Sequence, residues 1–148
     1  MRQVMQIILL VIRIGSGAWI LKQGYEKLTG GFSIYGLISV VAHDHDIPNW
    51  YKFFFAHAVA PFDMIYQDII PLGEIAIGLG LICGILVRVA SFFGIILMLN
   101  YILSDMIFTY PIQLFGFVML IMAPWPKYVF SVQPVIERLI HGTYSHRR

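Results

Sequence analysis

The chain has 148 residues, of which 59% are hydrophobic and only 12% are charged, and its formal net charge is +2. A soluble domain of this length leaves too much surface in water to carry so many apolar side chains, so the composition argues against a soluble enzyme and indicates a protein that lies in lipid. The small net charge, without a basic stripe interleaved with aromatic residues, argues against a nucleic-acid partner.

The first predicted transmembrane helix covers about residues 3–27. Its basic start and apolar run resemble a signal peptide, but Arg13 interrupts the run and no small-x-small cleavage site follows cleanly. We therefore expect an uncleaved helix, which at about 1.5 Å per residue is long enough to cross about 30 Å of hydrocarbon. Gly30 and Gly31 are expected to end it.

The next segment, residues 32–62, is amphipathic and aromatic, and we expect it to lie flat in the membrane interface. Asp46 is expected to cap a short helix over "IPNWYKFFFAHAVA". The preceding "AHDHDIP" offers four possible metal ligands, which His57 could join: His43, Asp44, His45 and Asp46. No fixed three-ligand spacing is present, so a solvated loop that caps a helix is the competing interpretation, and no bound metal is expected.

Three further spans follow, and they cover about residues 66–88, 89–108 and 111–126. Another amphipathic helix is expected on the membrane surface at 130–142. The expected fold is therefore a single all-α domain over residues 1–148. It is a four-helix transmembrane bundle with an interfacial amphipathic segment between the first and second helices.

Lysine and arginine positions predict the orientation of these spans. With both termini cytoplasmic, six basic residues would face the cytoplasm: Arg2, Arg88, Lys127, Arg138, Arg147 and Arg148. The outer side would carry three lysines together with five acids: Lys22, Lys27, Lys52, Asp44, Asp46, Asp63, Asp68 and Asp105. We therefore expect a multi-pass protein of the cell membrane with both termini in the cytoplasm.

Four polar side chains, one on each span, fall at similar depths near the bilayer centre: Arg13, Glu74, Asn100 and Gln113. A charge that faces lipid at that depth costs at least about 2.5–3.5 kcal/mol, so these side chains should point inward and meet. The simplest arrangement is an ion pair between Arg13 and Glu74, with the two amides satisfying the remaining donors and acceptors. The pair could merely fix helix register. Alternatively, it could form the floor of a cavity open to the outer side.

Helical periodicity also sorts the small residues into faces. One face of the first span carries Arg13, Gly17, Gly24 and Lys27, and one face of the second carries Glu74, Gly78, Leu81 and Arg88. A separate face of the second span carries Ala76, Gly80 and Gly84, whose spacing permits close contact with a neighbouring helix.

The chain has one cysteine, Cys83, so neither an intrachain disulfide nor a CxxC redox pair is possible within it. Its sequence also lacks the cysteine patterns that ligate haem or iron–sulfur clusters. We expect Cys83 to pack within an apolar helix.

Two motifs resemble a known family. "RIGSGAWILKQGYEKL" resembles the first-helix signature of the DoxX/DoxD membrane proteins, an arginine followed by a glycine-spaced run that ends in G-x-x-K-L. "PLGEIAIGLGLICGILVRVAS" resembles their second signature, a G-E followed by G-x-x-L-x-x-G, an arginine and small residues. The two motifs cover about a quarter of the chain, and the four-span layout is similar over most of it.

The resemblance implies an activity, because the best-defined members of this family are the membrane subunit of thiosulfate:quinone oxidoreductase. It implies quinone as the membrane substrate, and a second protein subunit or a homo-oligomer as partner besides the lipid bilayer. On this hypothesis Glu74 or Asp105 would handle protons, and the substrate-binding residues would be Arg13, Lys22, Lys27, Asn100 and Tyr101. The alternative is a non-catalytic accessory or assembly subunit of a larger membrane complex, such as a respiratory complex. A small-anion carrier is disfavoured because the inner half of the second span is apolar.

Overall fold

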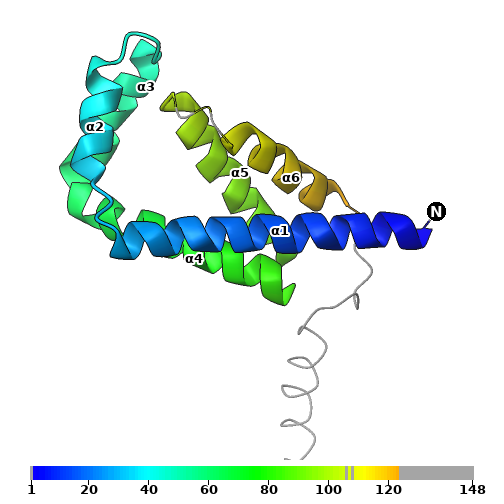
Figure 1. Cartoon of the computed structure of the whole chain (residues 1–148). Coiled ribbons are helices and arrows are strands. Elements are labelled where there is room, and N and C mark those ends of the chain that lie inside the picture. The colour runs from blue at the N-terminus through cyan, green and yellow to red at the C-terminus, as the bar shows by residue number, and fades with distance from the viewer. Residues whose placement is uncertain (1, 106, 108, 124–148) are drawn as a thin grey trace, which may run out of the picture.

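The computed structural model describes residues 2–105, 107 and 109–123, and the elements within them are helical, which confirms the predicted all-α class (Figure 1). The α-helices are α1 (Arg2–Thr29), α2 (Ile34–His43), α3 (Asn49–Phe54), α4 (Asp63–Cys83), α5 (Val87–Leu103) and α6 (Tyr110–Met122). A π-helical turn, Phe55–Val59, and a 3₁₀ turn, Ala60–Phe62, join α3 to α4. The surface helix predicted at 130–142 lies outside the described residues.

Two helical stretches, Val4–Thr29 and Asn49–Cys83, are long and apolar enough to cross a membrane. The other apolar helices are shorter, because α5 has 17 residues and α6 has 13, which correspond to about 25 Å and about 20 Å. The arrangement with four complete spans therefore stays a prediction.

The boundary between the second and third helices differs from the predicted one. Gly84 adopts a left-handed conformation with φ of 68°, and the amide of Ile85 donates to the carbonyl of Gly80 at 2.9 Å. This is the way in which a glycine ends a helix. The helix therefore stops at Cys83, and Arg88 lies in the first turn of α5 as an exposed residue, so its placement on the α4 face was wrong.

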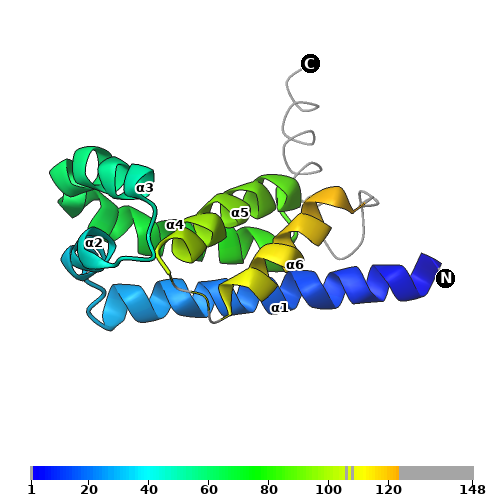
Figure 2. The same ribbon diagram turned by 90° about the horizontal axis from the view of Figure 1, so that it is seen from above.

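The segment between α1 and α4 folds back on itself as α2 and α3. Figures 1 and 2 show both helices grouped at the end of α1 that lies far from the N-terminus. The side chain of Gln67 on α4 holds the start of α2, because it accepts a hydrogen bond from the amide of Ile34 at 2.8 Å and donates one to the carbonyl of Phe32. The predicted cap was wrong, since the N-cap residue of α3 is Pro48 and no side chain caps this helix.

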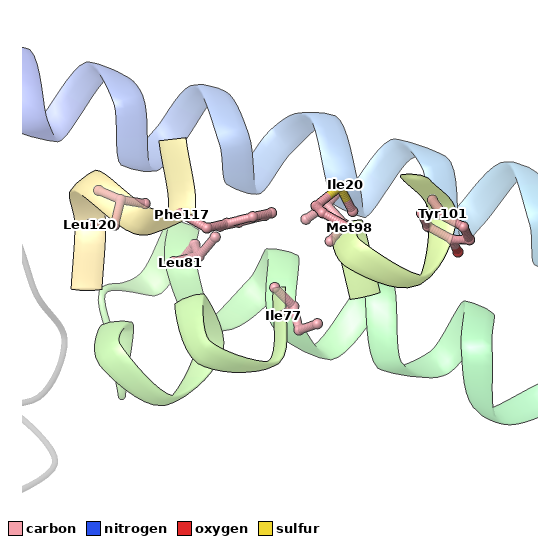
Figure 3. Packing of buried hydrophobic residues seen from close by; sticks show 7 residues of the cluster. All are labelled: Ile20, Ile77, Leu81, Met98, Tyr101, Phe117 and Leu120. Atoms are coloured by element: carbon pink, nitrogen blue, oxygen red, sulfur yellow. The ribbon is translucent and has the colours of Figure 1, made fainter. Parts of the chain in front are cut away.

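Two apolar clusters hold the helices together. The first takes residues from α1, α4, α5 and α6, and Figure 3 shows them converging between the helices: Ile20, Ile77, Leu81, Met98, Tyr101, Phe117 and Leu120. The second joins α2 to α3 and the π-helical turn, and it contains Ile34, Leu37, Val41, Ile47, Tyr51, Phe55 and Val59.

Glycines bring α1 and α4 into close contact. A Cβ atom added to Gly78 would lie 2.7 Å from the Cβ of Leu21 and 2.8 Å from the carbonyl oxygen of Gly17. Because no side chain larger than hydrogen fits there, the predicted packing faces of Gly17, Gly24 and Gly78 are confirmed. On the other face of α4, a Cβ at Gly80 would meet Ala90 of α5 at 3.4 Å, as the small-residue spacing predicts.

Candidate functional site

The contact between α1 and α4 brings a buried carboxylate to a lysine. The Nζ of Lys27 donates a hydrogen bond to the Oε1 of Glu74 at 2.5 Å. The Glu74 side chain is completely buried, whereas the Lys27 side chain keeps 18% of its surface exposed. A buried ion pair of this kind is strongly destabilised when one partner is removed, because the other charge then stays in the interior without compensation.

The phenol of Tyr101 is hydrogen-bonded to both members of this ion pair. The hydroxyl of Tyr101, on α5, donates to the Oε1 of Glu74 at 2.6 Å and accepts from the Nζ of Lys27 at 2.5 Å. The ring of Tyr110, from the first turn of α6, lies 4.7 Å from the Tyr101 ring, centroid to centroid. The Lys27 ammonium also lies 5.7 Å from the centroid of the Phe32 ring, within range of a cation–π interaction. We call Lys27, Glu74 and Tyr101 the buried triad.

The sequence around Gly24 makes this geometry possible. A Cβ at Gly24 would lie 2.8 Å from both the Cβ of Glu74 and the carbonyl oxygen of Pro71, so only glycine lets α1 approach α4 at this level. Lys27 follows three residues later on the same helical face and therefore points toward α4 as well. The close approach of the two backbones thus sets the position of the ammonium beside the carboxylate.

The predicted ion pair between Arg13 and Glu74 was wrong, because the partner of Glu74 is Lys27. Arg13 is buried, with only 2% of its surface exposed, and it does lie on the α1 face that packs on α4. However, Gly24 is the α1 residue that faces Glu74. Arg13 precedes Gly24 by eleven residues, or about 16 Å along the helix, which is beyond the reach of its side chain.

The two amides also lie away from the buried triad, so the single polar layer was a wrong prediction. The Oδ1 of Asn100 accepts from the hydroxyl of Tyr51 at 3.1 Å, and its Nδ2 donates to the carbonyl of Ile96 at 2.8 Å. Gln113 is buried at the α1–α6 contact, where it lines a separate hollow with Ser16 and Trp19.

The remaining predicted site residues are near the surface. Lys22 forms an exposed ion pair with Glu26 at 3.5 Å. Asp105, at the end of α5, lies beside Asp44 and Asp46, with carboxylate oxygens within 4.8 Å of one another. The structure therefore brings Glu74, Lys27 and Tyr101 together, but not Asp105 or Lys22.

The three histidines form no ligand group of three with carboxylates or cysteine within the described part of the chain. The Nδ1 atoms of His43 and His57 each lie 2.9 Å from the backbone carbonyl oxygen four residues earlier in their helices. Acidic groups near a protein surface commonly gather without a metal, and Asp46 and Asp105 are exposed while Asp44 is half-buried, so this group carries no metal assignment.

Two neighbouring cavities lie next to the buried triad. The inner cavity has a volume of about 220 Å³ and lies beneath α2 and α3, where its wall includes Tyr51, Tyr101 and Ser104. The outer groove has a volume of about 640 Å³ and runs between α4 and α5, past Gly73, Ala76 and Gly80. Four residues belong to both linings: Tyr66, Ile70, Leu97 and Asn100.

The sequence profile of the DoxX family matches residues 8–109, which is more than half of the chain and includes all three residues of the buried triad. The chain belongs to the DoxX family. Membership together with the apolar helices makes this DoxX protein a membrane protein. No curated protein and no solved structure matches the chain significantly.

Sequence reasoning recognised Tyr101 and Lys27 as site residues but missed the contacts that Tyr51, Tyr110 and Gln67 make in this DoxX protein. The contact of Tyr110 could have been predicted, because this residue lies at the start of the fourth predicted span, shortly after Tyr101 in the sequence. Tyr51 had none, since it belongs to an aromatic run in which any ring could have faced the bundle.

Proposed function

We propose that this DoxX protein is the membrane subunit of a quinone-linked oxidoreductase that acts on a small sulfur anion such as thiosulfate. In the proposed arrangement four spans cross the cell membrane and both termini are cytoplasmic. The buried triad then lies near the outer end of the bundle, beside the α2–α3 segment.

The buried triad is the observation that supports this proposal most. An ionisable group inside a membrane domain is costly to keep, and such groups often form part of a substrate or proton pathway. Here an ammonium, a carboxylate and a phenol are joined by hydrogen bonds of 2.5 to 2.6 Å. Such a chain can pass protons to a neighbouring acceptor without exposing a charge to lipid.

The proposed reaction has a definite requirement for protons. Two thiosulfate ions joined by a new S–S bond form tetrathionate and release two electrons, and a quinone that accepts two electrons also takes up two protons to become a quinol. We assign proton delivery to the Tyr101 hydroxyl, which is reprotonated by the Lys27 ammonium that donates to it, while the Glu74 carboxylate accepts protons and passes them to Lys27. Asp105 lies outside this group and has no such path in our proposal.

The charges expected to attract the anion give some support to the alternative, in which the protein is a non-catalytic accessory subunit. Lys22 and Lys27, the two lysines expected to attract it, each pair with a glutamate, so their net attraction for an anion is reduced. A second subunit would then supply the anion site and the path for electrons. If this DoxX protein contributes only membrane anchoring, the buried triad merely locks α1 to α4.

The test is purification from native membranes, identification of the proteins that copurify, and an assay of thiosulfate-dependent quinone reduction. We expect Tyr101→Phe to lower kcat with little change in the KM for thiosulfate, because the proton path is cut while the anion site is untouched. Tyr25→Phe, which makes the same change at an exposed tyrosine of α1, is the matched surface control and should behave like the parent protein. Quinone reduction that is unchanged in Tyr101→Phe would overturn the catalytic role of the triad and favour the accessory function.

A further inference from the structure

The two cavities next to the buried triad are neighbours, because they share four lining residues. The outer groove lies between α4 and α5, where exposed residues such as Ala76 and Phe93 form part of its wall. The inner cavity borders it at the shared residues Tyr66 and Asn100. Tyr101 of the buried triad is also among the residues that line the inner cavity.

The outer groove and the inner cavity differ in the kinds of residues that line them. The outer groove is almost entirely aliphatic and aromatic, which suits a hydrocarbon chain. The inner cavity has polar groups on one side, where the hydroxyl of Tyr51 lies 3.0 Å from the Asn100 carbonyl oxygen and 3.3 Å from the Ser104 hydroxyl. None of the described residues that line either cavity carries a formal charge.

This pattern selects one class of ligand. A mostly apolar pocket with a few convergent polar groups is the usual form of a small-molecule site. The polar end offers hydroxyls and an amide but no cation, so it suits an uncharged head with carbonyl acceptors, whereas a phospholipid would bring a charged phosphate into it. We infer that this DoxX protein binds a membrane quinone, with its ring in the inner cavity near Tyr51, Asn100 and Ser104 and its tail along the outer groove.

The inferred site rests on the proposed function and specifies where the quinone would bind. A ring in the inner cavity would lie against Tyr101, whose hydroxyl is hydrogen-bonded to Glu74 at 2.6 Å. Each two-electron reduction of the ring consumes two protons, which would arrive through that hydroxyl. The two electrons come from the sulfur anion through the partner subunit of the proposed complex.

The site can be tested without turnover, using the full chain in phospholipid nanodiscs. The probe is a photoreactive azidoquinone with a decyl tail, with unlabelled decylubiquinone as competitor and crosslinked peptides identified by mass spectrometry. We expect competed crosslinks in the peptides that contain Tyr51 and Asn100. Crosslinks spread over the lipid-facing surface, or competition no better than that by added phospholipid, would overturn the inference.

Two glycine substitutions make a matched pair. Gly73 lines the outer groove, and a Cβ there meets no atom within 4 Å, so Gly73→Leu should obstruct the groove without disturbing helix packing. Gly15 is equally unobstructed but lies on α1 away from both cavities, which makes Gly15→Leu the control. We expect half-saturation by decylubiquinone to rise about tenfold or more in Gly73→Leu and to stay within about twofold in Gly15→Leu.

The polar end is tested by Tyr51→Phe, which keeps the ring but removes the hydroxyl. The loss of one neutral hydrogen bond should weaken decylubiquinone binding about two- to tenfold. Binding that is unchanged in both Gly73→Leu and Tyr51→Phe would refute the site even if thiosulfate-dependent quinone reduction is intact. Conversely, competed binding that both substitutions weaken, in a protein without that reductase activity, would uphold the site and refute the proposed function.

Discussion

The pairing of Lys27 with Glu74 can be measured by a double-mutant cycle. The perturbations are Lys27→Met, Glu74→Gln and the two together, all in the full chain. In the structure these side chains meet at 2.5 Å, and only the lysine retains any exposure, at 18%. The two single variants should therefore lower the free energy of unfolding by different amounts, because each leaves a different charge without its partner.

Lys27→Met leaves a completely buried carboxylate that still accepts from the Tyr101 hydroxyl but has lost its cation, so we expect a loss of about 3–5 kcal/mol. Glu74→Gln keeps an acceptor for Tyr101 and leaves a lysine that can extend toward the surface, so about 2–3 kcal/mol is expected. The double variant carries no unpaired charge and should lose only about 1–2 kcal/mol, for one or two neutral hydrogen bonds. The destabilisation of the double variant should therefore be at least about 3 kcal/mol smaller than the sum of the two single values.

Equilibrium unfolding in mixed detergent micelles, followed by circular dichroism, would give these free energies. The control cycle combines Glu74→Gln with Arg13→Leu, which should be additive because Arg13 lies about 16 Å farther along α1. Additive costs for the Lys27 cycle, or equal coupling in the Arg13 cycle, would refute the assignment of the ion pair.

Three further outcomes are expected. Gly78→Ala should destabilise the protein by about 1–3 kcal/mol in the same unfolding assay, because the new methyl would lie 2.7 Å from a side-chain carbon of α1, whereas Gly73→Ala, which meets no atom within 4 Å, should not destabilise it. Leu86→Ile should cost about 1 kcal/mol, since Leu86 has a φ of 51° and a β-branched side chain is strained in that region; a thermal midpoint equal to that of the parent would contradict this. A cysteine introduced as His45→Cys in a Cys83→Ser background should react with a membrane-impermeant maleimide added to intact cells, and reaction only after lysis would reverse the proposed orientation.

The helices and their packing faces were predictable from sequence because they depend on local pattern. The apolar run of the first span, the glycines at 17 and 24 and the glycine at 78 follow helical periodicity, and periodicity determines which residues share a face. Membership of the DoxX family was also readable, because the two motifs lie on these same faces.

The partners of the buried charges were not predictable by the same reasoning. The similar depths of Arg13 and Glu74 depended on a second span that reaches residue 88, but α4 ends at Cys83, so the depths on the two helices had no common reference plane. Lys27 and Arg13 are 14 residues apart, or about 21 Å along α1, so without a common reference plane the partner of Glu74 was misplaced by about four helical turns. Depth also leaves the rotation of each helix undetermined, which is why Asn100 and Gln113 face elsewhere.

The buried triad also bears on how the protein is inserted during synthesis. Lys27 and Glu74 are 47 residues apart, so α1 leaves the ribosome well before the carboxylate of α4 does. A lysine near the end of a helix can wait among the lipid headgroups, because its long side chain extends outward. The shorter side chain of Glu74 lies three turns inside its helix and lacks that escape. The favourable moment for α4 to leave the translocon is therefore when it can pair with α1, so that the two helices pass into the lipid as a hairpin rather than one after the other.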